Sequence, residues 1–179
     1  LGRSVFNEDI KTMSEFSGQI NYQIIPKTIF TAIFNYYLVG IIRNGIHTKY
    51  HKIKGYEKEQ LKYKNYLDRV FDYLLKDIDI SAVISANYVY AWQQEIAKIC
   101  LERGIPFIVL QKEGVTAKED YFDVIKTYTN NNFIGTKLLV YNDNLKNAFL
   151  KLKIKGLNDS AIETAVSYTH LTLPTKRIV

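Results

Sequence analysis

Short apolar runs rich in β-branched residues alternate with amphipathic stretches along the second half of this chain. Three such runs occupy residues 81–86, 107–110 and 137–141. A strand, a helix and a second strand within about 30 residues form a βαβ unit, whose two strands are parallel and joined by a right-handed crossover. The pattern therefore predicts an α/β protein, a Rossmann-like three-layer domain whose parallel sheet is covered on both faces. We expect the first strand to be buried on both sides.

Amphipathic periodicity predicts the helices that accompany these strands. The expected helices span residues 57–78, 90–103 and 119–128. Gly104 follows the second of them and is the residue type that commonly ends a helix. A further helix follows the third strand, with either Asn142 or Asp143 as its N-cap.

Residues 29–42 are the most apolar stretch of the chain, but 14 residues fall short of the roughly 20 that a spanning helix needs. A buried helix is the preferred interpretation, and contact with a membrane surface is the other one. Residues 43–55 contain Asn44-Gly45 and several cations, which indicates a loop. We expect His47 and His51 to belong to this solvated loop rather than to a zinc site, because no carboxylate or cysteine lies among them.

The amino-acid composition indicates which kinds of protein and partner are compatible with this chain. An apolar content of 47% with 23% charged residues is typical of a globular domain and argues against disorder. The net charge of +6 suits an anionic ligand or an inner-membrane surface, but we expect no nucleic-acid partner, because no strand carries paired aromatic residues. The single cysteine, Cys100, excludes an intramolecular disulfide and indicates a reducing, cytoplasmic location. If residues 29–42 contact a membrane surface, the protein would be cytoplasmic and peripheral to the inner membrane.

Both ends of the chain are unusual. The first residue is Leu1 rather than Met, and residues 166–179 resemble the in-frame translation of a sequencing adapter. We therefore expect residues 1–165 to form one Rossmann-like domain, truncated at both ends, and residues 166–179 to be a non-native tail. A short terminal strand over residues 168–173 is the alternative for the tail.

Polar residues follow each predicted strand, where ligands bind in open parallel sheets. Asn87 follows the first strand, Lys112-Glu113-Gly114 the second, and Asn142 the third. No glycine-rich dinucleotide or phosphate-binding motif follows any strand, so no bound cofactor and no metal are expected in this domain. The segment from Gln111 to Gly114 has two interpretations, a ligand-binding loop or a polar turn.

A family resemblance adds to this pattern. It rests on Ile84-Ser85-Ala86-Asn87, Trp92-Gln93-Gln94-Glu95, the run from Gly104 to Leu110, Lys112-Glu113-Gly114 and Leu139-Val140-Tyr141-Asn142. Over residues 75–155 the chain resembles the N-terminal domain of glycosyltransferase-like proteins of the GT-B fold that make bacterial surface carbohydrates and capsules.

The resemblance implies an acceptor-side domain of a glycosyltransferase. It implies that Glu113 is the catalytic base and that Asn87, Glu95, Lys112, Gly114 and Asn142 bind substrate. The partners would be a saccharide acceptor and a nucleotide-sugar, and the nucleotide-sugar would bind a C-terminal domain that lies outside this sequence. The chain alone would then be inactive.

The chain departs from the family at one important position. Related capsule polymerases carry a pair of acids, or a His, before the glycine of this loop, whereas the first acid position here is Lys112. For Glu95, placement near the positive N-terminus of its helix competes with a role in the cleft. The alternative functions are a non-catalytic Rossmann-like ligand-binding module or half of a nucleotide-sugar epimerase.

Overall fold

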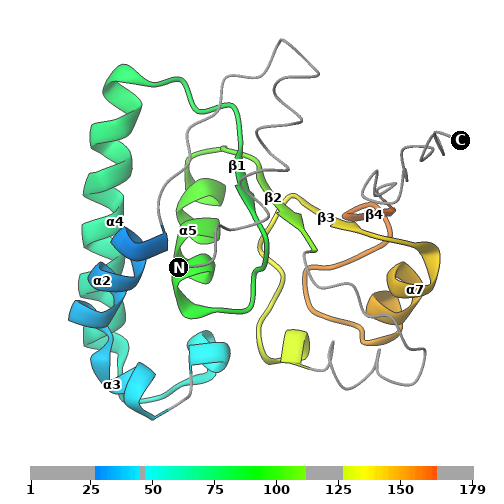
Figure 1. Ribbon diagram of the computed structural model, residues 1–179, viewed down its shortest axis with the longest axis horizontal. Helices are drawn as coiled ribbons and strands as arrows, with labels where there is room; N and C mark the ends of the chain where they lie inside the picture. The colour runs from blue at the N-terminus through cyan, green and yellow to red at the C-terminus, as the bar shows by residue number, and fades with distance from the viewer. Residues whose placement is uncertain (1–26, 45–46, 112–126, 165–179) are drawn as a thin grey trace, which may run out of the picture.

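The computed structural model describes residues 27–44, 47–111 and 127–164, as a four-stranded sheet with helices (Figure 1). The helical elements are α2 (Lys27–Tyr37), α3 (Val39–Arg43), η1 (His47–Lys52), α4 (Glu57–Asp77), α5 (Ala91–Glu102), η2 (Thr127–Asn130) and α7 (Asp143–Lys151). The strands are β1 (Val83–Ser85), β2 (Phe107–Leu110), β3 (Lys137–Val140) and β4 (Ile162–Thr164). No helix within these ranges combines the length and the apolar character that crossing a membrane requires.

The sheet confirms the predicted fold class. Its strand order is β1-β2-β3-β4, and every neighbouring pair is parallel. The expectation that the three predicted strands are parallel neighbours is therefore confirmed. The fourth strand, β4, was not predicted, because its three residues carry too little apolar sequence to show a pattern.

The two faces of the sheet differ in burial. Val109 of β2, Leu138 of β3 and Ile162 of β4 are buried and share one face, as their registers show. On the opposite face, Ile84 is 47% exposed and Leu139 is half-buried. The prediction that the first strand is buried on both sides is wrong for Ile84. When right-handed crossovers follow one another in the same direction across a sheet, their helices all lie on the same face. The helices α5 and α7 therefore lie on one face of the sheet and leave the face of Ile84 uncovered.

The helix α4 adds a layer outside α5 rather than covering a strand directly. It packs against α2 and α5, and α5 in turn packs against β2. Figure 1 shows α5 between α4 and the sheet. The buried residues Tyr63, Leu67 and Phe71 follow the predicted apolar stripe of α4, so this helix confirms the periodicity argument.

The structure refines several predicted boundaries. Residues 29–42 form two helices, because α2 ends at Tyr37 and α3 begins at Val39, with Leu38 buried between them. The predicted loop at residues 43–55 contains the 3-10 helix η1, whose Tyr50 is buried, so this prediction is wrong in part. A buried aromatic ring gives this polar segment a fixed position that its composition did not indicate.

Some predictions fall on residues outside the described ranges. These are the tail at residues 166–179, most of the helix expected at residues 119–128, and the loop residues Lys112, Glu113 and Gly114. The last two residues expected in that helix, Thr127 and Tyr128, open the 3-10 helix η2.

Candidate functional site

The carboxyl ends of the four parallel strands meet at one edge of the sheet, and this edge holds the candidate site. Ser85 ends β1, and Gln111 follows β2 with its backbone N–H donating to the Leu139 carbonyl at 2.9 Å. Asn142 follows β3, and Thr164 ends β4. Four polar residues from four strands therefore occupy the edge where the sequence predicted a ligand site.

Local hydrogen bonds fix the turn between β1 and α5. The Ser85 hydroxyl donates to the Asn87 carbonyl at 2.7 Å, and the Asn87 Oδ1 accepts from the Val89 N–H at 2.8 Å. Gln93 of α5 donates its Nε2 to the Ser85 hydroxyl at 3.0 Å. Side chains of Ser and Asn hold turns in this way because they satisfy backbone groups that neither strand nor helix uses. The Oδ1 of Asn87 therefore has a structural role.

Tyr128 links the ends of β1 and β2. Its hydroxyl donates to the Oε1 of Gln111 at 2.9 Å and accepts from the Nδ2 of Asn87 at 3.4 Å. Its ring lies 5.2 Å from that of Tyr88 and meets Phe149 edge-on at 5.1 Å. This group of residues, which we call the aromatic cover, consists of Tyr88, Tyr128 and Phe149. The three buried rings pack together beside Gln111 at the described part of the carboxyl edge.

The amide of Gln111 is only half satisfied. Gln111 is 4% exposed, and its Oε1 accepts from Tyr128, whereas its buried Nε2 meets no acceptor in the part of the chain that the structure describes. A buried donor without an acceptor costs about 1–3 kcal/mol. Such a group is rare in native proteins and often marks a place where a water or ligand binds.

Asn142 has a structural role that the sequence anticipated. Its Oδ1 accepts from the Leu145 N–H at 2.9 Å, which makes it the N-cap of α7. Between the two predicted candidates, the structure therefore selects Asn142. The neighbouring Asp143 accepts instead from the Thr164 hydroxyl at 2.6 Å and ties α7 to β4.

Glu95 lies on α5, which packs against η1 and α4. It is 4% exposed and lies near Tyr50 of η1 and Tyr63 of α4. Its Oε2 has no hydrogen-bond partner among the residues described. The two predicted settings were the cleft and the helix N-terminus, and the structure shows a third, a buried contact between α5, η1 and α4. Its assignment to substrate binding stays a prediction, without support from proximity to Asn87.

Burial raises the pKa of the Glu95 carboxyl above its ordinary value of 4.5, although Lys98 and the nearby Tyr50 favour the charged form. The folded state thus holds this proton more tightly than the unfolded state does. Protonated Glu95 therefore contributes its full stabilisation at pH values below the pKa that the carboxyl has in the unfolded chain. This contribution is lost as the pH rises through the pKa that it has in the folded protein. Ionised Glu95 also raises the pKa of Tyr63, after the larger effect of burial.

Replacing Glu95 with Gln should therefore stabilise the protein at neutral pH. Glutamine keeps the volume and removes the buried charge, so we expect a gain of about 1 kcal/mol at pH 7.5. The gain should shrink as pH falls towards 4.5. Urea unfolding at several pH values measures it, with Asp79→Asn, an exposed carboxylate outside the helices, as the control. A pH-independent effect, or a loss at neutral pH, would contradict the burial argument.

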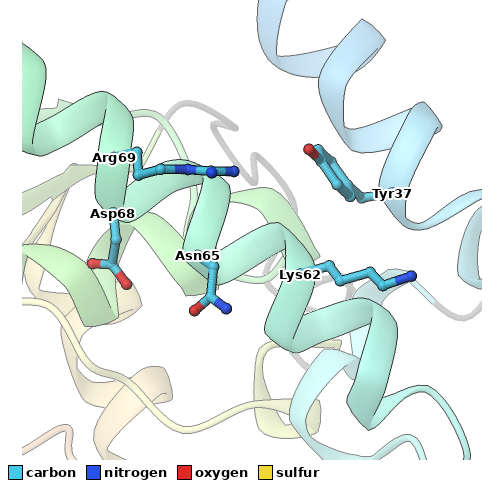
Figure 2. A pocket seen from close by; sticks show the side chains of 5 residues that line it. All are labelled: Tyr37, Lys62, Asn65, Asp68 and Arg69. Carbon is cyan, nitrogen blue, oxygen red and sulfur yellow. The ribbon is translucent and has the colours of Figure 1, made fainter.

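A second feature is an open groove on the outer side of α4. Its lining residues are Tyr37, Lys62, Asn65, Asp68 and Arg69. Figure 2 shows Lys62 and Arg69 extending to the same side as the Tyr37 ring, whereas Asn65 and Asp68 project away from it. The groove is formed by α2 and α4, elements that do not contribute to the carboxyl edge of the sheet.

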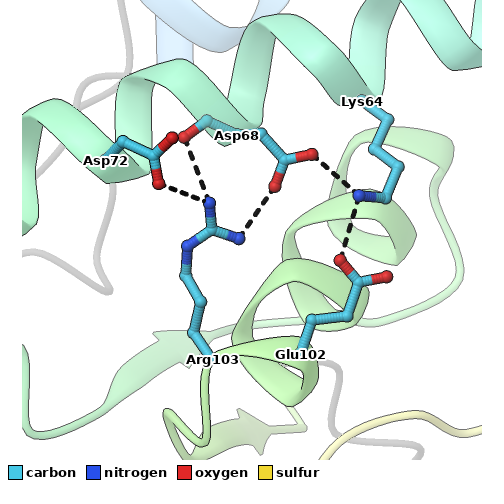
Figure 3. Close-up of polar contacts among 5 residues, drawn as sticks. All are labelled: Lys64, Asp68, Asp72, Glu102 and Arg103. Atoms are coloured by element: carbon cyan, nitrogen blue, oxygen red, sulfur yellow. Dashed lines mark hydrogen bonds and ion pairs between the residues drawn. The ribbon is translucent and has the colours of Figure 1, made fainter.

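Ion pairs join α4 to the end of α5 (Figure 3). Arg103 contacts Asp68 at 2.8 Å and Asp72 at 2.7 Å, and Lys64 contacts Asp68 at 2.7 Å and Glu102 at 2.9 Å. Burial opposes ionisation of Asp68, but the bonds from Lys64 and Arg103 outweigh it and lower the pKa of that carboxyl. The carboxylates of Asp68 and Asp72 therefore form ion pairs on the side of α4 that faces α5.

The described residues offer no metal centre. Within 27–44, 47–111 and 127–164, no group of three His, Cys, Asp or Glu side chains could hold a metal ion. Cys100 is a buried free thiol whose pKa burial raises to about 11, despite the opposing effect of Arg103. A thiol of this kind stays protonated and unreactive at neutral pH.

Sequence reasoning missed Tyr128 as a residue of the site, because it lies at the end of the helix expected at residues 119–128 rather than after a strand. Gln111 was part of the candidate segment after the second strand, but it was given no role of its own. Comparisons of this chain with protein-family models, with curated proteins and with solved structures find no match.

Proposed function

We propose that this chain is the acceptor-side domain of a glycosyltransferase-like protein that assembles a bacterial cell-surface polysaccharide. The observation that carries the proposal is the buried Nε2 of Gln111 at the carboxyl end of β2, which has no hydrogen-bond acceptor among the described residues. An N–H donor at this position suits the hydroxyl or carboxylate oxygen of a saccharide. Lys112 and Glu113 follow it directly in the chain.

The strand order supports the same location. In a doubly wound sheet, the ligand crevice lies where the strand order reverses. The order β1-β2-β3-β4 of the described strands has no reversal. If further strands made this sheet doubly wound, they would be added beside β1, and the strand order would reverse there. Asn87, at the end of β1, and Gln111, at the end of β2, would then border the crevice.

The chemistry assigns separate roles to the two residues that follow Gln111. Glu113 accepts the proton of the attacking acceptor hydroxyl as a general base, while the hydroxyl oxygen bonds to the anomeric carbon of the nucleotide-sugar and the nucleoside diphosphate leaves. Lys112 binds an anionic group of the acceptor. The nucleotide-sugar binds outside this domain.

The aromatic cover favours one alternative, a non-catalytic Rossmann-like ligand-binding module. Tyr128 and Gln111 are both buried, so a ligand at the Gln111 amide would be enclosed rather than exposed to a second substrate. Such a module would bind a saccharide without transferring it.

Saccharide binding tests the proposal. Titration calorimetry with uronic-acid oligosaccharides should show binding that weakens about tenfold in Lys112→Met and becomes less sensitive to salt. Lys151→Met, which removes an exposed cation at the end of α7, is the matched control and should bind normally. Equal binding by both variants would remove Lys112 from the site.

Transfer then separates the enzyme from the binding module. In a polypeptide that also carries the donor-binding domain, Glu113→Gln should lower the rate about 100- to 10,000-fold while acceptor binding persists. Near-normal transfer would eliminate Glu113 as the base. Binding without any transfer by the unmodified protein would support the binding module instead.

A further inference from the structure

One face of α4 carries only cations and tyrosines. Starting from Lys58, successive members of this stripe are four, four, three, four and three residues apart, the spacing of a single helix face. Its members are Lys58, Lys62, Tyr66, Arg69, Tyr73 and Lys76. All four cations and Tyr73 are exposed, and Tyr66 is half-buried. We call this set the basic–aromatic stripe, and it extends along nearly the whole of a helix about 30 Å long.

The cations of the stripe have no acidic partners in the described part of the chain. The acids of α4 that lie nearest in sequence to Arg69 are Asp68 and Asp72, and both pair with Arg103 on the side that faces α5 (Figure 3). The first-turn acids Glu57 and Glu59 lie at the helix N-terminus, where the helix dipole favours them. The ion pairs thus separate charge across α4 and leave its outer face positive.

Exposed tyrosine side chains of the neighbouring helix α2 extend the stripe. Tyr36 of α2 is 79% exposed, and Tyr73 within the stripe is 69% exposed. Tyr37 connects the two helices, because its ring lies 5.5 Å from that of Tyr66 and 5.0 Å from that of Tyr36. Figure 2 shows the Tyr37 ring beside the Arg69 and Lys62 side chains. The surface is therefore amphipathic rather than simply basic.

We infer that the outer face of α2 and α4 docks on an anionic lipid bilayer, with α4 lying along its surface. Lysine and arginine attract the anionic headgroups, and tyrosine rings settle at the boundary between headgroups and acyl chains. The exposed rings of Tyr36 and Tyr73 favour this partner over an acidic polysaccharide, which offers no apolar layer to bury them. A nucleic acid, whose bases also stack on tyrosine, is an outcome of the test below. The carboxyl edge of the sheet is built from other elements, so docking and saccharide binding are separable.

Vesicle co-sedimentation tests this inference. The chain should bind vesicles of phosphatidylcholine with phosphatidylglycerol, release them at high salt, and leave pure phosphatidylcholine vesicles unbound. Each cation near an anionic surface strengthens binding about fivefold, so Lys62→Gln with Arg69→Gln should weaken it more than tenfold. The matched control is Lys151→Gln with Lys155→Gln, which removes the same charge from exposed positions at and beyond the end of α7.

Two results would overturn the inference. The first is equal loss of vesicle binding in the two double variants, which would show an effect of net charge alone. The second is tighter binding to single-stranded DNA or to an acidic polysaccharide than to the anionic vesicles, with the same dependence on Lys62 and Arg69. Circular dichroism of each variant confirms that these surface substitutions leave the fold intact.

A labelled cysteine tests the orientation of α4. Cys100 is fully buried, so a cysteine placed on the surface can be labelled selectively with an environment-sensitive dye. A dye on Tyr73→Cys should shift to the blue when anionic vesicles are added, because its position enters the headgroup layer. A dye on Lys151→Cys should not shift. A larger shift at position 151 than at position 73 would place a different face on the membrane.

Discussion

Gly156→Ala is expected to lower the free energy of unfolding by about 3 kcal/mol or more, the sum of a left-handed backbone cost and a steric clash. Gly156 has a φ of +88°, and a Cβ at this position would lie 2.1 Å from the Phe133 carbonyl oxygen. This obstacle is backbone and cannot rotate away. The Phe133 N–H also donates to the Lys155 carbonyl at 2.8 Å, so the two segments are held together.

The matched control for this variant is Gly104→Ala. Gly104 has a φ of +67°, but a Cβ there would meet nothing within 4 Å. Only the backbone cost applies, about 1 kcal/mol. Guanidinium unfolding followed by circular dichroism measures both variants. Equal losses in the two variants would mean that the contact between Gly156 and Phe133 does not constrain the fold.

The effect of Gly156→Ala should reach the candidate site. The Phe133 ring meets the Tyr88 ring edge-on at 5.1 Å, and Tyr88 belongs to the aromatic cover. A shift of Phe133 would therefore displace Tyr88 and the aromatic cover to which it belongs.

Tyr128→Ala is the second large effect, with an expected loss of about 3–5 kcal/mol, as for other large aromatic residues in a core. The Tyr128 ring is fully buried between Tyr88 and Phe149, and its hydroxyl is the donor to the Gln111 Oε1. Truncation would leave a cavity and would also leave both polar atoms of the Gln111 amide without a partner.

Tyr128→Phe separates these two contributions. It keeps the ring and removes only the hydroxyl, so we expect a loss of about 1–2 kcal/mol. Urea unfolding of the two variants under the same conditions gives both values. A loss in Tyr128→Phe as large as in Tyr128→Ala would show that the hydrogen bonds, rather than ring packing, hold the cover in place. A negligible loss in Tyr128→Ala would contradict the packing described for this edge.

The candidate site was only partly predictable. The sequence placed Asn87 and Asn142 at the carboxyl edge of the sheet, and the structure places them there, although the Oδ1 of each also supports a local turn or cap. Glu95 was expected in the same cleft, and the structure places it beside Tyr50 and Tyr63, a contact that the sequence did not indicate. Helical periodicity identifies the face a residue occupies, but it does not identify which other element covers that face.

The local sequence determined those elements whose signals lie within a few neighbouring residues. The strand Phe107–Leu110 and the αL glycine Gly104 after α5 follow from short-range preferences, and the structure confirms both. The sequence left the N-cap of α7 open between Asn142 and Asp143, and the structure selects Asn142.

Only the tertiary structure decided the features that depend on distant partners. The strand β4 exists because Ile162 and its neighbours pair with β3, and its three residues carry no strand pattern of their own. The exposed face of Ile84 follows from the one-directional strand order, and the outward basic face of α4 follows from the pairing of Asp68 and Asp72 with Arg103. Pairing, burial and charge compensation are set by residues far apart in the chain, so a local pattern does not contain them.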